Sequence, residues 1–145
     1  MKTLKKFTAS FTFAVTVLTA TAVFAEGFLV QRAQRLPDLE LGLGAAGYGV
    51  SDHKYELETG KGYRLWLKAT GAKECAFTAP EFFQNVWFRK IEVNKVELKV
   101  QAVYEIEFER EGSAELFFTP IKPGEYEWVC DGLEHKGMKG VISVK

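Results

Sequence analysis

The sequence is short of the side chains that most often bind metals or carry out catalysis. Its 145 residues include two histidines, two cysteines and two methionines. With so few, and with no evident pairing of a nucleophile with a base, the usual hydrolytic sites have too few parts, and we do not expect an enzyme. Basic and acidic side chains number 19 each. This balance, without a clustered basic surface, argues against a nucleic-acid-binding protein.

A sustained helical pattern is also missing beyond residue 25, where no stretch keeps a 3.6-residue period between caps. The one short candidate, 80–88, predicts a single helical turn or a loop. What is present instead is a period of two, in which apolar residues alternate with mostly charged ones in 63–68 and 104–109. Short antiparallel strands of this kind predict a β-sandwich or a small barrel. Turn signals separate the runs at 58–62, 70–74, 110–113 and 122–125.

The only long apolar run lies at the N-terminus. Three lysines precede the apolar stretch 7–24, and Val23-Phe24-Ala25 offers small residues at the positions that a signal peptidase reads. The run contains six serines and threonines and barely reaches the roughly 20 residues that a membrane span needs. We therefore predict a cleaved signal peptide at 1–25, export to the periplasm and no stable membrane anchor.

The segment that follows, 26–53, is rich in turn-forming residues. It contains Pro37 and four glycines between positions 42 and 49. This composition argues against a helix and predicts an irregular N-terminal arm. We expect the arm to lie over a single β-domain formed by 54–145.

Near the end of the chain, Cys130, His135 and Met138 fall within nine positions. Tyr126, Trp128 and Cys130 share parity on one predicted strand, so the thiol should face the core with the two rings. The loop after this strand can turn His135 and Met138 back over the thiol. A thiolate, an imidazole and a thioether together favour copper. The alternative is a buried free cysteine, a surface histidine and a methionine used for packing.

The residues around this loop favour the copper site over the packing alternative. The run "PGEYEWVC", followed by His135, "GMKG" and a valine-rich strand, resembles the cupredoxins, the family of plastocyanin and azurin. The resemblance covers roughly 54–145 and implies an all-β, Greek-key β-sandwich. It also implies that Cys130 is the thiolate ligand, His135 the C-terminal imidazole and Met138 the axial thioether of a copper ion. The function implied is single-electron transfer with a redox partner protein.

The family pattern also contains an earlier histidine, and here the chain departs from it. The corresponding stretch is "CAFTAPEF", 75–82, and Cys75 stands where histidine is expected. Cys75 could itself be a ligand, since two thiolates, an imidazole and a thioether would prefer Cu(I). Alternatively, Cys75 and Cys130 could form a disulfide, which is permitted in an exported protein. As a third alternative, Glu74 or His53 could complete the site.

These alternatives lead to different functions. A site with one thiolate fits electron transfer, whereas two thiolates suit a periplasmic Cu(I) carrier or buffer that meets a copper-trafficking protein. A disulfide would leave a metal-free or weak site. The remaining alternative is a metal-free cupredoxin-like module with a structural or protein-binding role.

Overall fold

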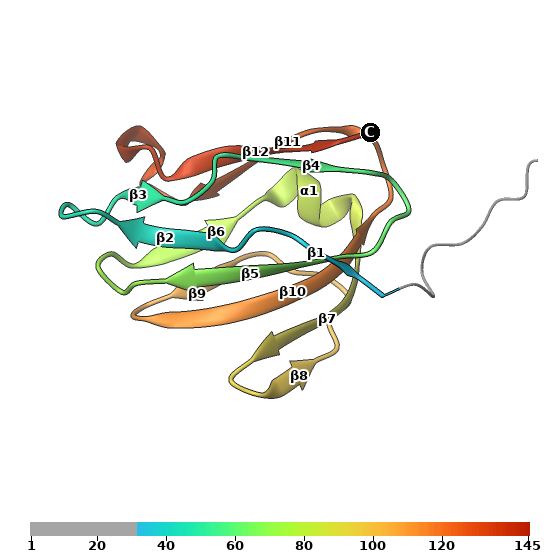
Figure 1. The fold of residues 1–145 in the computed structure, drawn as a ribbon, viewed down its shortest axis with the longest axis horizontal. Coiled ribbons are helices and arrows are strands. Elements are labelled where there is room, and N and C mark those ends of the chain that lie inside the picture. Colours follow the sequence, from blue (N-terminus) through green and yellow to red (C-terminus); the bar gives the residue numbers. More distant parts are fainter. Residues whose placement is uncertain (1–31) are drawn as a thin grey trace, which may run out of the picture.

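The computed structural model describes residues 32–145, which form two β-sheets packed face to face (Figure 1). The predicted signal peptide, 1–25, lies outside the described residues. Within 32–145, no helix has the length and apolar character needed to cross a membrane.

The sheets are named A and B. Sheet A has seven strands, in the order β3 (Gly49–Val50), β2 (Leu39–Leu43), β5 (Tyr63–Ala69), β10 (Gly112–Pro120), β7 (Val86–Val93) and β8 (Val96–Leu98), with β1 (Gln34–Arg35) also paired to β5. Sheet B has five strands, in the order β4 (Lys54–Leu57), β12 (Lys139–Val144), β11 (Gly124–Cys130), β6 (Cys75–Thr78) and β9 (Ile106–Phe108). Two short helical turns join strands, α1 (Pro80–Gln84) and the 3₁₀ turn η2 (Glu134–Lys136).

The period-two pattern marks the inner faces of the sheets. In β5, Tyr63, Leu65 and Leu67 are buried while the residues between them are partly exposed. In β11, Trp128 and Cys130 are buried in the same alternating way. These side chains belong to one hydrophobic core between the sheets. The prediction of an all-β sandwich is confirmed.

Helix α1 bridges the two sheets at one end of the sandwich. Pro80 stands in its first turn, where the missing N–H costs nothing. The ring of Phe82 lies 5.4 Å from that of Phe118 in sheet A and 5.6 Å from that of Tyr126 in sheet B, measured between ring centroids. Of the two alternatives expected within 80–88, a helical turn or a loop, the structure contains the helical turn, and its aromatic side chains pack into the core.

The strands differ from the sequence expectation in two ways, in the direction of some pairs and in the presence of a strand within the predicted arm. Strands β1 and β2 pair with β5 in parallel, and β4 pairs with β12 in parallel. The stretch expected to be irregular also contains a true strand, Leu39–Leu43, in which Leu39 and Leu41 are buried. Its glycines do not break that strand. Gly42 lies within it, at an irregularity in the register against β3, and has positive φ. Gly44 and Gly47, also with positive φ, lie in the tight turn that follows.

Candidate functional site at the Cys75–Cys130 disulfide

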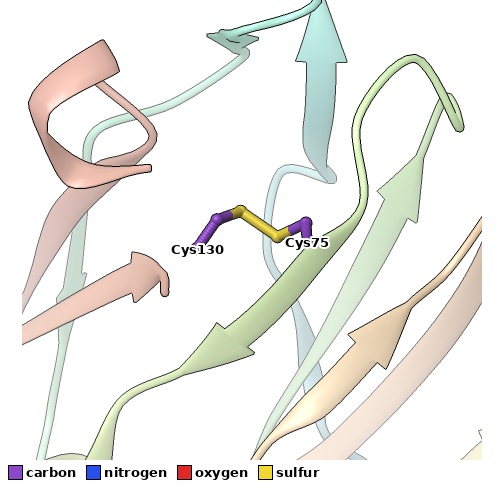
Figure 2. Close-up of a disulfide and its surroundings, with 2 residues drawn as sticks. All are labelled: Cys75 and Cys130. Carbon is purple, nitrogen blue, oxygen red and sulfur yellow. A yellow bond between two sulfur atoms is a disulfide. The ribbon is translucent and has the colours of Figure 1, made fainter. Parts of the chain in front are cut away.

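Cys75 and Cys130 are joined by a disulfide. Cys75 opens β6 and Cys130 ends β11, and Figure 2 shows the two side chains reaching toward each other from these strands. Cys130 lies directly opposite Phe77, so Cys75 is its diagonal neighbour across the strand pair. The Cα atoms are 5.0 Å apart, within the usual range for a disulfide. Of the alternatives that the sequence left open, the structure contains the bridge.

The loop after Cys130 folds back onto it. The N–H of Cys130 donates to the carbonyl of Met138 at 2.9 Å, and the N–H of Leu133 donates to the carbonyl of Cys130 at 2.9 Å. Met138 is fully buried, whereas His135 is exposed on the 3₁₀ turn. Gly137, at φ 94°, lets the chain leave that turn and enter β12. The loop therefore brings Met138 beside Cys130 and leaves His135 at the surface.

Aromatic rings pack beside the disulfide. The ring of Phe77 lies 5.6 Å from that of Trp128, and both side chains are buried. Trp128 lies opposite Gly140 on β12, and a Cβ on Gly140 would stand 2.6 Å from the indole Nε1. Sequence reasoning missed Gly140, although a glycine inside a strand is a signal that another group approaches closely.

The two alternative ligands, His53 and Glu74, have other partners. The Nδ1 of His53 is 2.7 Å from the carbonyl oxygen of Lys139, and the carbonyl of His53 accepts from the N–H of Val141. Glu74 is exposed, and its carboxyl group raises the pKa of Glu107 on β9. His53 thus holds β12 in place and Glu74 faces another carboxyl group.

Tyr48 links the predicted arm to this end of the sandwich. The ammonium of Lys73 lies 5.0 Å from the centroid of the Tyr48 ring, and that of Lys136 lies 5.7 Å from it. Both distances are within the range of cation–π attraction. The turn after β2 is therefore attached to the loop before Cys75 and to the loop after Cys130, a contact that no sequence pattern indicated.

The chemistry of the donors tests whether this site fits copper. In the oxidised form the site does not fit copper, because the two cysteine sulfurs are bonded to each other. Within residues 32–145, no three His, Cys, Asp or Glu side chains gather in a way that could hold a metal ion. Reduction would provide two buried thiols. Together with the buried thioether of Met138 in the adjoining loop, they make a soft donor set that fits Cu(I). The assignment of Cys75, Cys130, His135 and Met138 as ligands stays a prediction, and it applies to the reduced protein.

Comparison with known proteins identifies the fold. No family model matches the sequence, and no curated protein matches it. Solved structures do match. A multicopper oxidase from Campylobacter jejuni is similar over 85% of this chain and 32% of its own, with a TM-score of 0.53 and 13% identity. The 2F4 variant of the multicopper oxidase McoA from Aquifex aeolicus is similar over 77% of this chain and 29% of its own, with a TM-score of 0.59 and 13% identity.

Auracyanin B is similar over most of both chains. The match covers 82% of this chain and 94% of auracyanin B, with a TM-score of 0.50 and 14% identity. The chain spans about a third of the length of the two oxidases, or less. At these identities the similarity establishes the fold, which is a cupredoxin-like β-sandwich.

Proposed function

We propose that this chain is an exported copper-handling protein that binds one Cu(I) ion when its disulfide is reduced. Cys75, Cys130 and Met138 would hold the ion, with His135 as the outer donor. One observation supports this above all: two sulfurs meet at the buried end of β11, beside a buried methionine, where the cupredoxin resemblance implies copper. Export rests on the sequence pattern of residues 1–25.

The disulfide would act as the control on metal binding. Reduction adds two electrons and two protons to the bridge and yields two thiols. These thiols must lose their protons to become ligands, so Cu(I) affinity should rise with pH. Because both sulfurs are buried, the loop 131–138 must move before a reductant or a copper donor can reach them.

This arrangement favours a carrier or buffer over electron transfer. An electron-transfer site needs its thiolate in both oxidation states of the metal, whereas here Cys130 is consumed by the bridge when the protein is oxidised. Two thiolates also hold Cu(I) strongly and make redox cycling difficult. The partner we propose is a copper-trafficking protein. The oxidised form supports a second candidate, a metal-free module with a structural or protein-binding role.

Binding of Cu(I) by the reduced protein gives the direct test. Protein reduced without oxygen should take one Cu(I) per chain from a chromogenic chelator, while oxidised protein should take none. Both thiols should resist alkylation in the loaded protein and react once a stronger chelator removes the metal. The double variant Cys75→Ala with Cys130→Ala is the control and should leave Cu(I) with the chelator.

Two other outcomes of metal addition would support the alternative functions. Reduced protein that leaves all Cu(I) with the chelator would rule out the carrier and leave the metal-free module. An intense thiolate-to-copper absorption band after addition of Cu(II) would instead support electron transfer with a redox partner protein.

Met138→Leu separates a ligand from a packing residue. Leucine is similar to methionine in volume, so the oxidised variant should lose less than about 1.5 kcal/mol of stability. If Met138 is a ligand, loss of the thioether should weaken Cu(I) binding by roughly tenfold, or about 1.4 kcal/mol. Competition titrations of both reduced proteins measure the difference. Equal affinities would mean that Met138 serves only in packing, and His135→Ala applies the same test to the imidazole.

A further inference from the structure

The β7–β8 hairpin extends from the end of sheet A, with β8 on its outer side (Figure 1). The turn consists of Asn94 and Lys95, which have φ values of 47° and 67°. Two consecutive residues with positive φ make the tight turn that suits a two-residue hairpin. Within the described residues, no strand pairs with the outer edge of β8. The hairpin therefore presents a free sheet edge.

One face of this hairpin is apolar and exposed. Val93 pairs with Val96, and Ile91 pairs with Leu98. Ile91 reaches the core, but Val93, Val96 and Leu98 are 38%, 56% and 43% exposed. Three neighbouring apolar side chains thus continue the core-facing surface of sheet A beyond the point where sheet B covers it.

The opposite face carries a chain of ion pairs. Lys90 contacts Glu92 and lies 3.0 Å from a carboxylate oxygen of Glu97, and Lys99 lies 2.6 Å from the other oxygen of Glu97. Hydrogen bonds from Lys99 and Lys90 lower the pKa of Glu97 to about 2. Glu97 is therefore ionised throughout the physiological range.

The register decides which backbone groups of β8 are free. In a two-residue hairpin the residues that flank the turn form a hydrogen-bonded pair, so Val96 and then Leu98 use their N–H and C=O groups on β7. The groups of Glu97 and Lys99 consequently point outward. A strand added at this edge would bond to these two residues.

We propose that two copies of this chain associate through β8, edge to edge and antiparallel, with the two-fold axis at Leu98. In that register Glu97 lies opposite Lys99 of the second copy, and Lys99 lies opposite Glu97. Both are hydrogen-bonded pairs, which matches the outward backbone groups. Leu98 meets Leu98 of the second copy on the apolar face. The interface is isologous, as a closed dimer requires.

The charges of Glu97 and Lys99 favour this register, and they favour a second copy of β8 as the partner strand. An axis at Glu97 or at Lys99 would set like charges opposite each other, which is unfavourable across a strand pair. Charged residues on an edge strand usually discourage pairing. Here one acid and one base stand two positions apart, so symmetric pairing places each beside an opposite charge of the second copy, in addition to the Glu97–Lys99 pair within each chain. A second copy of the same strand is thus complementary to β8 in hydrogen bonding, charge and apolar contact.

Sedimentation equilibrium of the purified protein, up to about 1 mM, tests the proposal. The unaltered protein should show a monomer–dimer equilibrium that shifts toward monomer at high salt. Lys99→Glu should raise the dimer dissociation constant at least about tenfold, because Glu97 then faces a second carboxylate. Combining it with Glu97→Lys should restore association, since the opposite charges are exchanged in both copies.

A second pair of variants addresses the backbone. Lys99→Pro removes an outward N–H without disturbing the bonds to β7, whereas Lys99→Ala keeps that N–H. The proline variant should remain monomeric at every concentration, and the alanine variant should still dimerise. Equal unfolding midpoints would show that both hairpins are intact. The proposal is overturned by a protein that stays monomeric throughout, or by a dimer that survives both Lys99→Glu and Lys99→Pro.

Discussion

Reduction of the Cys75–Cys130 disulfide is expected to lower the free energy of unfolding by about 4 kcal/mol. The bridge joins residues 55 positions apart, and a loop of that length restricts the unfolded chain strongly. The native contacts should survive, because β6 and β11 are also held by backbone hydrogen bonds such as Asp131 N–H to Ala76 O. Urea unfolding with and without a dithiol reductant, followed by tryptophan fluorescence, measures the difference.

The double variant Cys75→Ala with Cys130→Ala gives the control. It should unfold near the midpoint of the reduced protein, and the reductant should not change it further. Addition of Cu(I) to the reduced protein should restore part of the loss, about 2.7 kcal/mol at a free concentration 100 times the dissociation constant. A midpoint that is the same with and without reductant would show that the bridge is absent in the purified protein.

Gly140→Ala is expected to destabilise the protein by about 3 kcal/mol. The new Cβ would overlap the indole of Trp128, at 2.6 Å from Nε1 and 2.7 Å from Cε2, and would also meet the carbonyl oxygen of His53. Trp128 is 1% exposed, and its ring packs against that of Phe77. The carbonyl of His53 is held by its bond to Val141, so the backbone cannot yield easily. Urea unfolding of the oxidised variant measures the loss.

Gly62→Ala is the matched control. It makes the same change at a glycine of ordinary φ, where the nearest atoms to the new Cβ are 3.8 Å away. It should be neutral or stabilising by about 0.4–1 kcal/mol, since alanine restricts the unfolded chain. Equal effects of the two substitutions would show that Trp128 does not pack on Gly140 as described.

Much of the fold could be predicted from periodicity. Alternation in 63–68 identified the inward face of β5, and the parity of Trp128 and Cys130 identified that of β11. The strand Leu39–Leu43 could not be recognised, because Gly42 interrupts its short apolar run and Gly44 and Gly47 follow closely. Its pairing with β5 depends on burial of Leu39 and Leu41, which tertiary contacts decide. The parallel pairs have no local signal at all.

The sequence predicted where Cys130 and Met138 lie, but not that Cys130 is bridged to Cys75. The sequence placed Cys130 at the end of an inward-facing strand and Met138 in the following loop, and the structure buries both. Whether Cys75 lay near enough to bridge depended on the register of β6 against β11, which residue spacing does not contain. The exposed position of His135 likewise follows from the 3₁₀ turn, a local choice that the glycines on either side did not reveal.

The parallel pairing of β4 with β12 joins two strands that are far apart in the sequence, so β4 is synthesised well before the strand with which it pairs. His53 and Lys139, which are joined at the start of this pair, are separated by 86 positions, as are Thr59 and Lys145 at its other end. At roughly 5–20 residues per second, the ribosome needs about 4–17 s to proceed from one strand to the other. Throughout that interval β4 has no strand beside it, since β12 is its neighbour in sheet B. A chaperone that holds the nascent chain would therefore find Tyr55 and Leu57, both buried after folding, still accessible.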